Sequence, residues 1–145
     1  FMPNLQKIEN CGFFNSKLEY VDFPLLEEIA THALSENKFV HLYFPKLRKA
    51  LGSCNINNCP NLLTFQAPRL QQFADLFLYD CKKLQTVIAP KASLSDRTFF
   101  RCKNLTAILA IGRSRCICQQ CPECCGKFDQ CLKRGQSALV QDKLN

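Results

Sequence analysis

The chain has 145 residues, of which 47% are hydrophobic and 21% are charged, and its formal net charge is +7. This length predicts one domain, and the hydrophobic content is high enough for a continuous core, which excludes a largely disordered chain. No apolar run approaches the roughly 20 residues that cross a bilayer. The positive charge is spread along the chain without a basic run interleaved with aromatic residues, so we expect no nucleic-acid partner.

The chain opens in the middle of a repeating unit. Pro3–Ile8 matches Pro24–Ile29, but the apolar segment that should precede Pro3 is absent from the sequence. We therefore expect an N-terminally truncated piece of a longer protein. The compartment stays unknown, because a targeting segment would lie before the first residue.

A template of seven residues, L-x-x-V-x-A/F-P, recurs along the chain, with phenylalanine as the first residue of one copy and no proline in the last. Its first position falls at residues 18, 39, 62, 84 and 105, so that the steps are 21, 23, 22 and 21 residues. A nearly constant period in this range indicates a solenoid with one supersecondary unit per repeat. Offsets 3 and 5 lie on one face of a strand, and offset 0 turns inward where the strand begins. The predicted inward residues are Leu18, Val21, Phe23, Phe39, Leu42, Phe44, Leu62, Phe65, Ala67, Leu84, Val87, Ala89, Leu105, Ile108 and Ala110.

The proline after each template should end the strand, because proline cannot donate a hydrogen bond to a ladder. A second apolar pair follows at P-x-L-x-x-I, as in Leu26 and Ile29. We therefore predict a repeat solenoid of the leucine-rich-repeat class over residues 1–110. Its five short strands would form one curved parallel sheet, with turns and short irregular or 3-10 segments on the other face. Residues 111–145 would form a cysteine-rich tail that is partly disordered.

One cysteine recurs in each of the later units, three residues before the template. These are Cys59, Cys81 and Cys102, and the earlier units carry Asn15 and Glu36 at the same distance from the template. Stacking would hold the three side chains parallel rather than facing one another, which makes them poor disulfide partners. We expect them to act as small buried residues in the reduced state.

The combined pattern F/L-x-x-C-x-x-L-x-x-V-x-x-P-x-L-x-x-I resembles the BspA-like leucine-rich repeat over about residues 3 to 110. This repeat occurs in bacterial surface proteins and in large protein families of anaerobic protists. The resemblance implies protein recognition or adhesion, and it supplies no catalytic residues to carry over. The Ala-Phe turn of the family is only partly present here, and the cysteine-rich tail is a departure from its pattern.

The tail places six cysteines within sixteen residues, at Cys116, Cys118, Cys121, Cys124, Cys125 and Cys131. The C-x-x-C-x-x-C spacing from residue 118 lets two thiolates hold one metal ion from a tight turn. Three interpretations stay open: structural zinc held by four of the six, a disulfide-stapled end cap, and an unstructured thiol-rich tail that is a candidate for acylation. An iron–sulfur cluster fits less well, because the run lacks a fourth cysteine at the x3 spacing. No other cofactor is expected, and spacing alone assigns no metal ligand.

The cysteine count also bears on the compartment. Eleven cysteines are an odd number, so a monomer keeps at least one of them unpaired. Together with the unpaired column expected in the repeats, this favours a reducing, cytoplasmic location over the cell surface.

The sequence offers little for catalysis. Its two histidines are His32 and His41, and no nucleophile elbow, glycine-rich phosphate loop or H-E-x-x-H motif is present. We therefore expect no enzymatic activity.

Offsets 2 and 4 of each strand point away from the core and predict a binding surface. Tyrosines on a rigid sheet contribute a large contact area at a low entropic cost, which suits the recognition of a protein partner. The candidate surface consists of Tyr20, Asp22, His41, Tyr43, Thr64, Gln66, Thr86 and Ile88.

We therefore expect a non-catalytic module for protein–protein recognition or adhesion, and the sequence leaves its oligomeric state open. The alternative is a structural component of an extracellular coat or wall, cross-linked through the tail cysteines. Leucine-rich repeats followed by a cysteine-rich segment resemble protist cyst-wall proteins in plan, although the repeats of those proteins are of a different subtype. Covalent multimers on non-reducing electrophoresis would indicate the coat.

Overall fold

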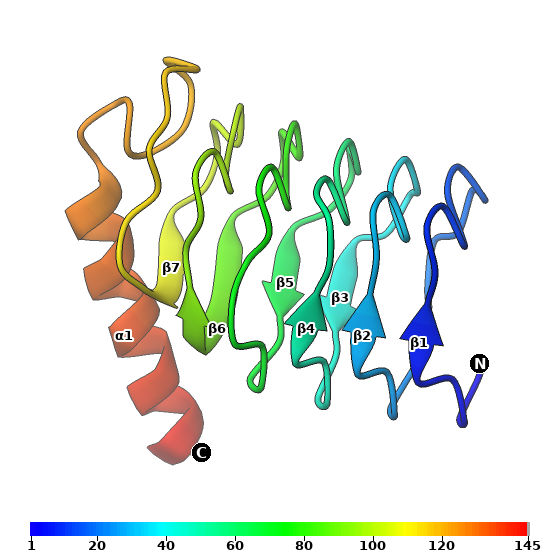
Figure 1. The fold of residues 1–145 in the computed structure, drawn as a ribbon. Helices are drawn as coiled ribbons and strands as arrows, with labels where there is room; N and C mark the ends of the chain where they lie inside the picture. Colours follow the sequence, from blue (N-terminus) through cyan, green and yellow to red (C-terminus); the bar gives the residue numbers. More distant parts are fainter. Residues whose placement is uncertain (145) are drawn as a thin grey trace.

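The computed structural model describes residues 1–144 of the chain, with side chains up to residue 138. The chain winds as a parallel β-solenoid, and a helix follows its last strand (Figure 1). The elements are β1 (Lys7–Ile8), β2 (Glu28–Ile29), β3 (His41–Tyr43), β4 (Lys49–Ala50), β5 (Thr64–Gln66), β6 (Thr86–Ser93), β7 (Ala107–Ile111) and α1 (Phe128–Leu144). Among the described residues, no helix is both long and apolar enough to cross a membrane.

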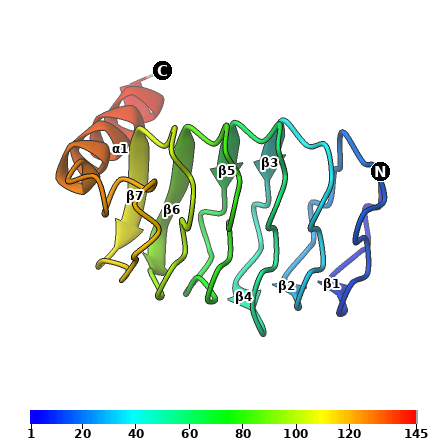
Figure 2. The same cartoon turned by 90° about the horizontal axis from the view of Figure 1, so that it is seen from above.

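Two parallel sheets lie on opposite faces of the solenoid (Figure 2). One sheet has the order β3-β5-β6-β7, and its strands come from the template half of each repeat. The other has the order β1-β2-β4, and its strands come from the half that follows the proline. The expected solenoid is confirmed, but the second face carries short strands where we predicted irregular or 3-10 segments.

The first sheet has four strands rather than the predicted five. Residues 18–23 carry the template but form no strand, and their segment meets the next repeat where the Lys38 N–H donates to the Leu18 carbonyl at 2.7 Å. On its other side the template half of the segment meets only residues 1–2, through the Met2 N–H, which donates to the Asp22 carbonyl at 3.2 Å. It therefore lacks the pairing on both sides that favours a strand inside a stack.

Proline ends the strand in two repeats but not in the third. β3 and β5 stop before Pro45 and Pro68, as predicted, whereas β6 continues through Pro90. The pairing of β6 with β7 shifts register between Ile88 and Ser93. Proline is compatible with such an irregular stretch, because no ladder hydrogen bond from its nitrogen is needed there.

The core is one continuous column of apolar side chains. Of the predicted inward residues, only Leu18, Val21 and Ala110 are half-buried rather than buried, and these lie in the first and last template segments. Aromatic rings meet inside the stack: the Phe65 ring lies 5.4 Å from that of Phe77 and 6.3 Å from that of Phe44. The predicted inward register is therefore confirmed.

The helix α1 was not predicted, and it packs along the outer side of β7 (Figures 1 and 2). A Cβ atom on Gly135 would lie 2.1 Å from the Ile108 carbonyl oxygen, so glycine permits a close approach to the strand. One turn earlier, the buried Cys131 donates its thiol hydrogen to the Leu105 carbonyl at 3.5 Å. The division of the chain at residue 110 stays a prediction, and residue 145 of the tail lies outside the described residues.

Candidate functional site

The predicted binding residues follow the register of the first sheet. One column contains His41, Thr64 and Thr86, and the neighbouring column contains Tyr43, Gln66 and Ile88. Tyr20 and Asp22 lie in the segment before β3 and belong to no strand. The side chains alternate with the buried residues of β3 and β5, as expected for a sheet with one open face.

Six of the eight predicted residues share one shallow depression of about 490 Å³. They are Tyr20, Asp22, His41, Tyr43, Thr64 and Gln66, and Val21 and Leu42 complete the lining. The template predicts core positions for Val21 and Leu42, and their place at this surface was not expected. Thr86 and Ile88 continue the two columns on β6, where both are half-buried, but they lie outside the depression.

The depression combines exposed aromatic rings with polar groups. Tyr20 is 72% exposed and Tyr43 is 59% exposed, so both rings offer most of their area to solvent. His41 Nδ1 lies 2.8 Å from Thr64 Oγ1, which ties neighbouring strands together at the surface. Because the depression is open and shallow, it suits contact with a protein surface better than enclosure of a small molecule.

The repeat cysteines behave as the sequence predicted. Cys59, Cys81 and Cys102 are fully buried, and each thiol donates to a backbone carbonyl of the preceding repeat, at 3.6, 3.3 and 3.0 Å. Burial raises the pKa of Cys102 well above its ordinary value, so its thiol stays protonated. These residues fill the core.

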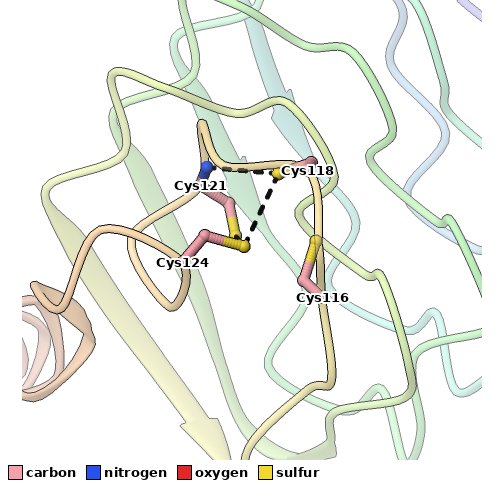
Figure 3. A group of neighbouring side chains, drawn as sticks. All are labelled: Cys116, Cys118, Cys121 and Cys124. Carbon is pink, nitrogen blue, oxygen red and sulfur yellow. Dashed lines mark hydrogen bonds between the residues drawn. The ribbon is translucent and has the colours of Figure 1, made fainter.

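The tail brings four cysteine sulfurs together at one point (Figure 3). The Sγ atoms of Cys116, Cys118, Cys121 and Cys124 all lie within 4.8 Å of one another. Cys124 Sγ is 3.5 Å from Cys121 Sγ and 3.9 Å from Cys118 Sγ. The cluster could therefore hold a metal ion, and it selects four of the six candidates that the spacing left open.

Backbone N–H groups converge on one sulfur of this cluster. Cys118 Sγ accepts from the N–H groups of Arg101, Gln120 and Cys121 at 3.3, 3.4 and 3.3 Å. Burial raises the pKa of Cys118, but these donors, together with the Cys116 thiol, outweigh it and lower the pKa to about 6. Burial raises the pKa of Cys116 to about 11. The surroundings of Cys118 therefore favour the thiolate, which is the form that binds metals.

The other two tail cysteines point elsewhere. Cys125 is exposed and donates its thiol hydrogen to the Gln119 carbonyl at 3.6 Å. Cys131 belongs to α1 and is buried against the last repeat through its bond to Leu105. The spacing of the sequence did not separate these two residues from the four clustered ones, because only the folded tail shows which sulfurs converge.

Charged groups of both signs lie beside the cluster. Arg97 and Arg115 line a small depression with Cys116, and Asp96 is the acidic member of the same lining. The Ser114 hydroxyl forms a hydrogen bond with the carboxylate of Glu123, which lies between Cys121 and Cys124 in the sequence. Two arginines and two carboxylates therefore lie in the surroundings of the sulfurs.

A model of the BspA type leucine rich repeat region matches residues 1–128 of the chain in six copies. The match extends beyond the solenoid end predicted at residue 110 and includes the four clustered cysteines. No curated protein matches the chain, and no solved structure matches it.

Proposed function

The chain belongs to the BspA-type leucine-rich-repeat family, and we propose that it is a non-catalytic recognition module whose protein partner binds the open face of β3, β5 and β6. Membership of the family supports a protein-interaction or adhesion module in general. The single observation that supports this face is the depression in which Tyr20 and Tyr43 stand exposed among polar groups.

Two properties of this surface favour a protein partner. The two tyrosines present large apolar rings with a hydroxyl at the tip, which is the combination enriched at the centres of protein interfaces. Tyr43 lies on β3, which is paired in register with β5 and backed by the buried side chains Leu42 and Phe65, whereas Tyr20 lies in the segment before β3. The β3 part of the surface is therefore ordered before binding, so less conformational entropy is lost on association.

The test is capture of partners from the native source by the full chain. We expect the double variant Tyr20→Ala/Tyr43→Ala to lose a partner that the parent chain retains, by about tenfold or more in recovered amount, as for two interface hot spots. Leu51→Ala is the matched control, because Leu51 is 45% exposed and lies just after β4 in the other half of the repeat. Equal recovery by all three proteins would place the interaction elsewhere.

We further propose that Cys116, Cys118, Cys121 and Cys124 hold one Zn²⁺ in a structural role. In a tetrahedral site with Zn–S bonds of about 2.3 Å, neighbouring sulfurs lie about 3.8 Å apart. Cys124 Sγ lies 3.5 Å from Cys121 Sγ and 3.9 Å from Cys118 Sγ, and these two separations bracket that value. Four thiolates fill the coordination shell and leave no position for a substrate, and such soft ligands favour zinc over magnesium or calcium.

Native mass spectrometry of the chain purified without chelator tests this proposal. We expect one zinc per chain, and we expect Cys118→Ser to lose it. Cys125→Ser is the matched control, because this exposed cysteine lies in the same loop but outside the cluster. A metal-free parent chain would contradict the zinc site. The cross-linked coat stays an alternative prediction, which covalent multimers would support.

A further inference from the structure

A column of backbone N–H groups runs along one turn of every repeat. Its members have left-handed backbone conformations, with φ values of 50°, 58°, 53°, 60° and 62° at Asn15, Glu36, Asn58, Asp80 and Arg101. In the first four, the N–H group donates to a backbone carbonyl of the next repeat, at 3.0, 3.0, 2.7 and 2.8 Å. This column also corrects the alignment of the repeats that was predicted from the sequence. Glu36 is structurally equivalent to Asn58 and not to Cys59.

The last member of the column has a different acceptor. The Arg101 N–H donates to Cys118 Sγ at 3.3 Å, where its equivalents reach a carbonyl of the following repeat. The sulfur therefore occupies the position of a repeat carbonyl. Cys118 Sγ also belongs to the four-cysteine cluster. The same atom therefore accepts the last hydrogen bond of the column and forms part of the cluster.

Other atoms of the tail also take positions that a repeat would supply. The Leu94 N–H donates to the Ile111 carbonyl, and the Arg97 N–H donates to the Arg115 carbonyl, both at 2.9 Å. In return, the Arg115 N–H donates to Asp96 Oδ1 at 3.4 Å. The first repeats show the same exchange, since the Thr31 N–H donates to Asn10 Oδ1 at 3.2 Å.

We infer that the zinc-loaded cluster is the end cap of the solenoid: residues 111–118 reproduce the hydrogen-bond acceptors of a further repeat, and the metal ion holds them in place. This inference rests on the zinc site of the proposed function. The structural role of the site is to satisfy the backbone N–H donors that the last full repeat would otherwise expose.

A metal ion is needed at this position because the segment has almost no core of its own. In the repeats, each turn is held by buried apolar residues such as Leu34, Ile56 and Leu78. The tail offers Ile117 at a comparable place, and it is 87% exposed. Coordination of four sulfurs replaces the missing apolar contacts, as structural zinc does in small domains without a sufficient core.

The electrostatics agree with a loaded site. Zinc with four thiolates carries a net charge of about −2, which is costly to place at a protein surface without compensation. Arg97 and Arg115 line a depression with Cys116, together with the single acidic residue Asp96, and three N–H groups donate to Cys118. Hydrogen bonds to the coordinating sulfur lower its effective charge and orient it.

Amide hydrogen exchange on the ¹⁵N-labelled full chain tests the cap. We compare the zinc-loaded protein with the same protein after treatment with a chelator, and we read the Arg101 and Asp80 amides individually. Metal removal should accelerate exchange at Arg101 by about tenfold or more, because its acceptor is no longer held in place. Asp80 belongs to the same column but donates to Phe100 inside the stack, so its exchange should not change.

Two variants complete the test. Cys118→Ser should show fast Arg101 exchange whether or not zinc is added, and Cys125→Ser should behave as the parent chain does. If zinc binds but its removal leaves Arg101 exchange unchanged, the cap is refuted while the zinc site stands. If Asp80 accelerates as much as Arg101, the metal supports the whole fold and the cap is likewise refuted. A chain that binds no zinc refutes both.

Discussion

The repeats and the tail use cysteine in opposite ways. Cys59, Cys81 and Cys102 are fully buried in the stack, where each thiol donates a hydrogen bond to a backbone carbonyl. Cys118 in the tail accepts hydrogen bonds from three backbone N–H groups and lies among three other sulfurs. The surroundings of Cys81 and Cys102 retain the proton on sulfur, whereas those of Cys118 favour its removal.

This contrast reflects how each region is held together. Residues 18–111 carry an apolar side chain at the inward positions of every template, and their burial stabilises each turn together with hydrogen bonds between repeats. The segment between β7 and α1 has few such side chains, and it relies on backbone acceptors and clustered sulfurs instead. A repeat fold can therefore end without a further apolar layer when the terminal segment supplies the missing acceptors.

The largest effect is expected inside the stack. Leu84 is fully buried in a middle repeat, and Leu84→Ala should reduce the free energy of unfolding by about 2–5 kcal/mol, through lost transfer energy and the cavity left behind. Thr86→Ala, two residues further and half-buried, should change it by about 0.5 kcal/mol or less. Denaturant titration measures both values, and similar costs would contradict the register of the repeat.

A smaller effect is expected where the helix meets the stack. Gly135→Ala should destabilise the protein by about 1–3 kcal/mol, because the added methyl would overlap the backbone of Ile108. This loss opposes the gain in helix propensity of about 1 kcal/mol that alanine brings. Ser137→Ala, exposed on the same helix, is the control and should be neutral to slightly stabilising. Thermal unfolding followed by circular dichroism measures the stability of both variants. Equal unfolding temperatures for Gly135→Ala and Ser137→Ala would mean that α1 does not pack closely on β7.

The smallest effect is expected from alkaline pH. Burial raises the pKa of Cys81 and of Cys102 above the ordinary value of 9.0, so the folded chain keeps protons that the unfolded chain releases. The stability that these thiols provide is therefore complete below pH 9 and falls as the pH rises above it. At pH 9 the loss is about 0.4 kcal/mol for each thiol, from the linkage between protonation and folding.

Comparison with Cys102→Ala isolates this contribution. The variant lacks one of the two thiols, so its free energy of unfolding should fall less steeply between pH 8 and pH 10 than that of the parent chain. Urea titration at each pH measures this free energy for both proteins. Parallel profiles for the two proteins would mean that the Cys102 thiol does not retain its proton in the folded state.

The sequence by itself determined the solenoid. The recurrence of L-x-x-V-x-A/F places apolar side chains at the same offsets in every unit, and side-chain periodicity is a local property of the chain. The buried residues Leu62, Phe65 and Ala67 and the outward residues Thr64 and Gln66 follow from it directly. The two columns of outward positions follow as well, because stacked repeats bring equivalent positions together, whereas the depression beside Tyr20 was not predicted.

Only the tertiary structure decided the details that depend on contacts between repeats. The run of β6 through Pro90 depends on its shifted pairing with β7, and the position of α1 depends on the space above Ile108. Neither is visible in a local pattern, because both are set by a neighbour far away in the sequence.

The same holds for the cysteine cluster. Spacing within the tail marked six candidates, but it could not show that Cys116 joins Cys118, Cys121 and Cys124 while Cys131 turns toward Leu105. Nor could it show that Arg101, 17 residues earlier, donates to Cys118. Convergence of donors and ligands is a property of the path of the backbone in space, and that path is set by the packing of the last repeat against the segment that follows it.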